Sequence, residues 1–172
     1  GAPYVASAVI PPTGTVQLIE IDKDLGEAER LQRIDFTIFG KPVVKKNTQK
    51  VSVYRGKPVK YSTAAYLHWE NFTYAQLADI VKAYERMTGE KWRTIDWTFN
   101  MEARFFVPTF GVVDLSALYE GIQDCMKKAD IIIDDDAWHL ISHDGSGVSK
   151  DPDNPRMEIS LTRRAPSWQT PR

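Results

Sequence analysis

The sequence predicts an α/β (α+β) fold, a single domain in which a mixed β-sheet is covered by two helices. Three observations lead to this prediction. Two segments show apolar residues at helical spacing, strand-like segments lie before, between and after them, and 172 residues are enough for one hydrophobic core. Helices separated by strands argue against an all-α bundle, and one short repeat of this order argues against a large doubly wound sheet.

The structured domain is expected to span residues 33–163. Residues 1–32 contain a lead with proline and glycine and then a charged stretch, so we expect a peripheral N-terminal extension there, and a loose tail over residues 164–172. The first strand is predicted over residues 34–40, IDFTIFG, because apolar side chains alternate along it.

A hairpin and a long helix are expected next. Residues 54–57, YRGK, have the composition of a hairpin turn. Ser62 or Thr63 is expected to cap a helix that runs to about Thr88 and is ended by Gly89. Its apolar side chains recur at spacings of three and four: Tyr66, Trp69, Phe72 or Thr73, Leu77, Ile80, Val81 and Tyr84.

The clearest strand is predicted over residues 94–107, where every second side chain is apolar. Asp114 is a natural N-cap for a second helix, and Gly121 lies in the middle of that helix. A helical glycine costs roughly 1 kcal/mol relative to alanine, so we expect a packing contact that requires it. Two last strands, residues 138–143 and 156–162, are expected to flank a flexible polar loop.

Charge is unevenly distributed along a chain whose formal net charge is −1. Residues 41–60 contain cations and no acid, and residues 111–136 contain seven carboxylates against two lysines. The first segment would attract a polyanion and the second would repel it, unless a metal ion changes the local sign. The seven cations of the first segment are Lys41, Lys45, Lys46, Lys50, Arg55, Lys57 and Lys60.

Several classes of protein are disfavoured. No stretch approaches the roughly 18 apolar residues of a membrane span. The single cysteine, Cys125, fits a reducing cytoplasm and argues against a structural zinc site. His139 and His143 are four residues apart, but on a strand this spacing separates them by roughly 13 Å, too far to share one ion.

Acidic residues bracket the second predicted helix. Asp114 precedes it, Glu120 and Asp124 lie one turn apart on it, and residues 134–136 are three consecutive aspartates. Such carboxylates would suit Mg²⁺, which binds a few protein oxygens and otherwise keeps its waters. Three aspartates between apolar segments are also typical of a solvated turn, and their spacing alone leaves both interpretations open.

The order of these elements resembles the RusA family of Holliday-junction resolvases, which is common in phages and prophages. The resemblance covers about residues 34–163 and includes the stretches FTIFGKPVVKKN and YSTAAYLHW. It is most specific where the family reads D-x-D-N-L-x-K, then an aspartate, then a pair of aspartates. At these positions, without a gap, this chain has Asp114, Ser116, Ala117, Leu118, Glu120, Asp124, Asp134 and Asp135.

This resemblance implies a homodimer that binds four-way DNA junctions and cuts them with Mg²⁺, or with Mn²⁺ in its place. It also implies a location in the cytoplasm of a bacterium or of a phage-infected cell. The first aspartate of the motif corresponds to Asp114 and the second of the pair to Asp135. Two positions depart from the family: Ser116 replaces its second catalytic aspartate, and Glu120 replaces its lysine.

Two hypotheses follow from these departures. In the first, Glu120 supplies the carboxylate lost at Ser116, one helical turn away. The catalytic residues are then Asp114, Glu120 and Asp135, the metal ligands are Asp114, Glu120, Asp134 and Asp135, and the seven cations of residues 41–60 bind DNA. In the second, the protein is an inactive RusA-like module that binds DNA or another protein.

Two further points complete these hypotheses. The cation lost with the family's lysine could be replaced by Lys45, Lys46 or Lys127. An enzyme acting on a small molecule has no supporting motif, and would require a large apolar pocket away from the acidic residues.

Overall fold

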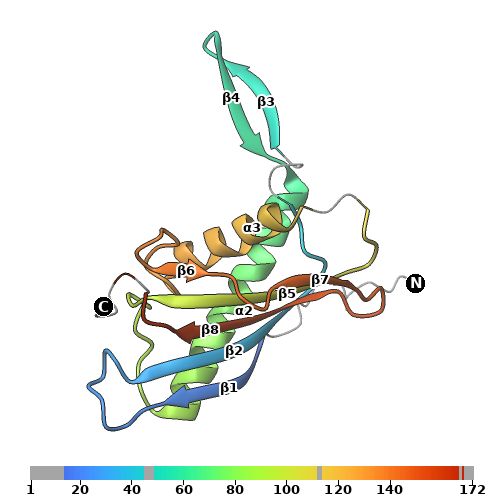
Figure 1. Cartoon of the computed structure of the whole chain (residues 1–172). Helices are drawn as coiled ribbons and strands as arrows, with labels where there is room; N and C mark the ends of the chain where they lie inside the picture. The colour runs from blue at the N-terminus through green and yellow to red at the C-terminus, as the bar shows by residue number, and fades with distance from the viewer. Residues whose placement is uncertain (1–13, 45–48, 112–113, 167, 169–172) are drawn as a thin grey trace.

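The protein is one mixed α+β domain in the computed structural model, which describes residues 14–44, 49–111, 114–166 and 168 (Figure 1). The predicted combination of one mixed sheet and two helices is confirmed. The elements of the described residues are β1 (Thr15–Ile21), β2 (Leu31–Phe39), β3 (Gln49–Tyr54), β4 (Lys57–Ser62), α2 (Ala64–Thr88), β5 (Phe99–Val107), α3 (Leu115–Lys128), β6 (Leu140–Ser142), β7 (Gly147–Lys150) and β8 (Arg156–Arg163).

The main sheet has the strand order β1-β2-β8-β5-β6, and β7 also pairs with β5. Neighbours from β1 to β5 are antiparallel, whereas β6 and β7 run parallel to β5. Strand β8 therefore lies between β2 and β5, the two strands with the clearest alternation of apolar side chains in the sequence. Its Leu161 pairs with Ile34 on one side and Met101 on the other, and all three side chains are fully buried.

Helices α2 and α3 begin at their predicted caps, and α2 also ends at its predicted glycine. Thr63 caps α2 by accepting a hydrogen bond from the Tyr66 amide, and Gly89 ends the helix with a φ of 72°. Asp114 caps α3. The expected apolar stripes face the core, where Tyr66, Leu77 and Ile80 of α2 are buried together with Leu118, Ile122 and Met126 of α3. No helix of the described residues is long and apolar enough to cross a membrane.

Three strands differ from the sequence-based expectation. Strand β1 lies within residues 1–32, expected to be peripheral, but it forms the edge of the main sheet beside β2. The strand predicted over residues 94–107 is regular only from Phe99, and Ile95 forms an isolated bridge to Ile132. The loop expected to be flexible contains β7, which pairs with β5 over four residues. Strand β7 has only four residues, too few for an alternation of apolar and polar side chains to be recognised from the sequence.

Strands β3 and β4 form a separate antiparallel hairpin, as the YRGK turn predicts. Arg55 and Gly56 at its tip have φ values of 51° and 75°. Such positive values fit the two-residue turns that suit the twist of a hairpin. Figure 1 shows the hairpin projecting away from the main sheet, beyond the N-terminal end of α2.

Gly121 is retained because α2 and α3 approach closely at this residue. A Cβ atom on Gly121 would lie 3.2 Å from Cη2 of Trp69 and 3.5 Å from the carbonyl oxygen of Val43. Trp69 is itself almost fully buried, so it has little room to move. The packing contact expected from the cost of a helical glycine is therefore confirmed.

Gln76 of α2 completes the hydrogen bonding of β2 where β1 no longer reaches. Its Oε1 accepts a hydrogen bond of 2.7 Å from the Phe39 amide, and its Nε2 donates one of 2.9 Å to the Phe39 carbonyl. Among the described residues, the pairing of β1 with β2 reaches as far as Thr37. The fully buried side-chain amide thus takes the place of a strand residue.

Replacement of Gln76 by leucine is expected to destabilise the fold by about 2–4 kcal/mol, because it leaves a backbone donor and an acceptor of Phe39 without their partner. Urea unfolding followed by circular dichroism would measure this loss. Lys82→Leu, at an exposed position of the same helix, is the control and should change the free energy of unfolding by no more than about 0.5 kcal/mol. Equal effects of the two substitutions would contradict the structural role of Gln76.

Candidate functional site

The polar face of α3 presents two groups of predicted site residues, one near each end of the helix. At the N-terminal end, Oδ1 of Asp114 accepts hydrogen bonds from the backbone amide of Ser116 at 3.0 Å and from its hydroxyl at 2.8 Å. Ser116 therefore binds Asp114 through both its backbone amide and its hydroxyl. Asp124 lies ten residues further on, roughly 15 Å along the helix axis.

The carboxylate of Asp135 is held near the other end of α3. Its Oδ2 accepts a hydrogen bond of 2.8 Å from Nε2 of Gln123, and its Oδ1 lies 2.9 Å from the ammonium nitrogen of Lys127. The side chain of Asp135 is only about a fifth exposed. Gln123 and Lys127 are four residues apart on the helix, so both reach the same carboxylate from one face.

Asp124 shares the cation that binds Asp135. Its Oδ1 lies 3.6 Å from the Lys127 nitrogen. Asp124 and Asp135 thus flank a single cationic position, which is the strongest concentration of opposite charge among the predicted site residues. Because the side chains of both aspartates are mostly buried, water screens this interaction less than it screens a surface ion pair.

A histidine extends this network. Nε2 of His143, which directly follows β6, lies 2.9 Å from Oε1 of Gln123. The imidazole stacks on the ring of Tyr119, with the ring centres 4.0 Å apart and the planes inclined by 10°. The side chain of Gln123 is therefore in contact with Asp135 at one end and with His143 at the other.

These contacts change the protonation equilibria of the site. Burial raises the pKa of the Asp135 carboxyl, but the hydrogen bonds from Lys127 and Gln123 more than offset this, and the resulting pKa lies below the ordinary value. The hydrogen bond to Asp135 raises the pKa of Lys127. Burial lowers the pKa of His143, which favours its neutral form.

The other predicted ligands occupy different positions. Glu120 is exposed on α3, one turn before Asp124. Oδ1 of Asp134 accepts a hydrogen bond of 2.8 Å from the backbone amide of Asp135, and Asp136 binds the backbone amide of Trp138 and Nδ1 of His139. Within the described residues, no three His, Cys, Asp or Glu side chains come close enough to hold one metal ion. The four-carboxylate ligand set stays a prediction.

Sequence reasoning missed part of the network that the structure brings together. It included Lys127 as a substitute cation but did not assign Asp124 to the ligands, and it gave no role to Gln123. The i, i+4 spacing of Gln123 and Lys127 was a signal that both could reach one partner. The approach of His143 to Gln123 depends on how β6 lies beside α3, and no local pattern reports it.

The cations predicted to bind DNA are placed only in part. Lys41, Arg55 and Lys57 are exposed, and the Arg55 guanidinium lies 5.3 Å from the centre of the Tyr54 ring. Lys50 and Lys60 belong to β3 and β4. Lys45 and Lys46 lie outside the described residues.

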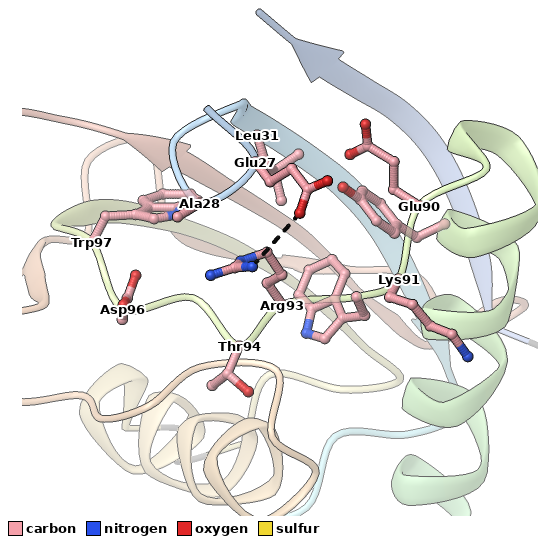
Figure 2. A pocket seen from close by; sticks show the side chains of 11 residues that line it. Glu27, Ala28, Leu31, Glu90, Lys91, Arg93, Thr94, Asp96 and Trp97 are labelled. Atoms are coloured by element: carbon pink, nitrogen blue, oxygen red, sulfur yellow. Dashed lines mark ion pairs between the residues drawn. The ribbon is translucent and has the colours of Figure 1, made fainter. Parts of the chain in front are cut away.

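A pocket of about 280 Å³ lies away from α3, between the loop that joins β1 to β2 and the segment that joins α2 to β5 (Figure 2). In Figure 2, Arg93 extends into it and forms an ion pair of 3.9 Å with Glu27. Glu90, Lys91 and Asp96 also line it. It is therefore not the large apolar pocket that an enzyme acting on an apolar small molecule would require.

Comparisons with known proteins add no assignment: no family model matches the sequence, and no curated protein matches it significantly.

Replacement of Lys127 by methionine is expected to raise the pKa of Asp135 toward or above its ordinary value of 3.8, because burial then acts without the ammonium partner. A ¹³C NMR titration of the Asp135 carboxyl carbon would measure the change. Lys128→Met is the matched control, because Lys128 lies next in sequence, is more exposed and pairs with Glu70 instead.

The same substitution should change the pH dependence of stability. Since the folded-state pKa of Asp135 lies below its unfolded value, this carboxylate stabilises the fold above the unfolded pKa, and the stabilisation is lost as the pH falls through the folded-state pKa. The Lys127→Met protein should therefore lose less stability than the original between pH 5 and about pH 2. An unchanged Asp135 titration would contradict the assignment of Lys127 as its main partner.

Proposed function

We propose that the protein is a RusA-like endodeoxyribonuclease that cuts branched DNA with Mg²⁺ and acts as a homodimer. The single observation that carries this proposal is the pair of carboxylates, Asp124 and Asp135, that flank one cationic position on the polar face of α3. The proposal also rests on the resemblance of the sequence motif, in which both residues coincide with acidic positions of the family.

The donor set suits a hard cation. Mg²⁺ commonly binds to one or two protein carboxylates and completes its coordination with water and with substrate phosphate oxygens. Asp124 and Asp135 offer two such carboxylates, facing a cation at 3.6 and 2.9 Å. When bound, Mg²⁺ supplies a Lewis acid that stabilises charge on a phosphate and lowers the pKa of water.

The side chains of the chain would then have distinct tasks. Asp135 and Asp124 hold the cation, with Asp134 beside them. Lys127, which reaches both carboxylates in the structure, would be free to turn toward a phosphate once another cation neutralises them. The exposed cations at and near the β3–β4 hairpin, Lys41, Arg55 and Lys57, would bind the DNA backbone without reading its sequence.

A second candidate function is favoured by the same ion pair. If Lys127 permanently neutralises Asp135, the acidic face needs no metal, and the protein would be a binding module that has lost catalysis. Ser116, which binds Asp114 in place of the family's second aspartate, fits this alternative. The two functions predict the same DNA binding and differ in cleavage.

The nuclease is expected to cut a synthetic four-way junction in Mg²⁺ or Mn²⁺ but not in EDTA. Asp135→Asn should reduce the cleavage rate by about 100-fold, because it removes one of the two carboxylates that face the cation. Its affinity for the junction, measured in Ca²⁺ or EDTA, should change by less than about 3-fold. Denaturing gels of end-labelled strands would measure the paired nicks.

Asp153→Asn is the control for this assay, because Asp153 is an exposed aspartate in the turn before β8, outside the network on α3. It should cleave like the original protein. Tight binding without cleavage in either metal would refute the nuclease and support the binding module. Failure to bind branched DNA would refute the nuclease and a DNA-binding module, and would leave a module that binds another protein.

The basic segment over residues 41–60, which includes the hairpin, is expected to supply phosphate contacts. Lys57→Gln and Lys41→Gln should each weaken junction binding, and each should reduce the slope of log affinity against log salt concentration by up to about 1. Fluorescence anisotropy across a salt series would measure both quantities. Lys91→Gln removes an exposed lysine at the pocket of Figure 2 and should leave the slope unchanged. Equal slopes for all three variants would exclude Lys41 and Lys57 as phosphate contacts.

A further inference from the structure

We infer that Gln123 is a positioning residue for Asp135, and that His143, stacked on Tyr119, fixes the orientation of the Gln123 amide. This inference extends the proposed function, and its consequence for catalysis rests on that proposed function. The geometric part stands on three contacts of described side chains: Gln123 with Asp135 at 2.8 Å, Gln123 with His143 at 2.9 Å, and His143 with Tyr119 at 4.0 Å between ring centres.

The direction of each hydrogen bond in this series follows from the Asp135 carboxylate, which is the acceptor at one end of it. An ionised carboxylate can only accept, so Gln123 must present its amide NH₂ group to Asp135. The Oε1 atom of Gln123 then faces His143 and needs a donor. Nε2 of His143 must therefore carry a proton, and in the neutral ring Nδ1 does not.

The opposite arrangement would be unfavourable at both ends. If the Gln123 amide were rotated by 180°, its oxygen would face the carboxylate oxygen of Asp135 at hydrogen-bonding distance, and two acceptors would repel. The Asp135 carboxylate thus sets the orientation of the amide, and the Nε2–H tautomer of His143 matches it, because a rotated NH₂ group would face the N–H group of this tautomer. His143 in turn has little freedom to move, since its ring lies almost parallel to Tyr119.

The network also explains why the Asp135 carboxylate is held against α3, although Asp135 belongs to the loop that follows this helix. Lys127 holds one carboxylate oxygen and Gln123 holds the other, so the plane of the carboxylate is fixed by two partners from one helix. If a metal ion replaced Lys127 as the partner of Oδ1, the bond from Gln123 would be retained. Gln123 would then be the contact that keeps Asp135 in place during the reaction.

Three variants test this inference. Gln123→Leu removes the amide, and Gln123→Glu keeps the shape but replaces the donor by an acceptor. His143→Phe keeps a ring to stack on Tyr119 but removes the Nε2 donor. Lys128→Leu is the control, because its side chain extends from the same helix toward Glu70 and not toward Asp135.

The structural readout is the ¹⁵N NMR spectrum of the imidazole, which needs neither metal nor activity. In the original protein, the neutral ring of His143 should be protonated at Nε2, and in Gln123→Leu the Nε2 resonance should shift because this nitrogen has lost its acceptor. In Gln123→Glu, the new carboxylate should raise the pKa of His143. A ring protonated at Nδ1 in the original protein, or an unchanged Nε2 resonance in Gln123→Leu, would overturn the inference.

The functional readout separates positioning from folding. Gln123→Leu and Gln123→Glu should lower kcat for junction cleavage by about 10–100-fold, with KM changed by less than about 3-fold, and His143→Phe should have a smaller effect in the same direction. Lys128→Leu should leave both constants unchanged. Equal losses in Lys128→Leu, or a full kcat in Gln123→Leu, would overturn the positioning role.

A failure of the proposed function would have a different signature. If the original protein cuts no branched DNA, the nuclease proposal fails, and the role of Gln123 is then decided by the NMR experiment together with the carboxyl ¹³C resonance of Asp135. That resonance should shift in Gln123→Leu and not in Lys128→Leu. If it shifts in neither, Gln123 does not hold Asp135.

Discussion

The close contact between Trp69 and Gly121 determines where the polar face of α3 points. Because Gly121 has no side chain, the indole ring of Trp69 packs directly on the helix, and the apolar stripe of α3 turns toward the core. The opposite face, with Gln123, Asp124 and Lys127, is then directed toward the segment that carries Asp135. A larger residue at position 121 would separate the two helices, and the partners of Asp135 would move with α3. The packing of the core and the geometry of the candidate site are therefore coupled through one residue.

The features that the sequence predicts well are those decided within a few residues. The caps Thr63 and Asp114 form local hydrogen bonds, Gly89 ends its helix through its own backbone conformation, and the alternation in β5 reports one buried face. The features that it misses depend on partners far along the chain. Strand β7 is short and acquires its hydrogen bonds only from β5, and the edge strand β1 only from β2.

The candidate site illustrates the same limit. A sequence motif identifies the acidic positions but cannot tell which of them meet, since Asp114 and Asp124 lie at opposite ends of one helix, roughly 15 Å apart. The structure pairs Asp135 with the end of α3 that carries Lys127, so Asp124 is its acidic neighbour. Glu120, selected because it lies one turn from Ser116, is exposed on the same face. Proximity on a helix was predictable, whereas the point at which the loop of aspartates returns to that helix was not.

The position of Lys127 links the two functions that remain in competition. The Lys127 ammonium lies between two partly buried carboxylates and offsets the cost of burying their charge. The folded state therefore needs no other cation to stabilise this pair. A divalent ion would interact with the same carboxylates with twice the charge, but it must displace Lys127 and lose part of its own hydration. The balance shifts toward the ion when a phosphate arrives, because the released ammonium then gains a new anionic partner. Under the proposed nuclease function, cation binding and DNA binding at α3 would therefore be coupled, and DNA that approaches along the basic hairpin would favour the exchange.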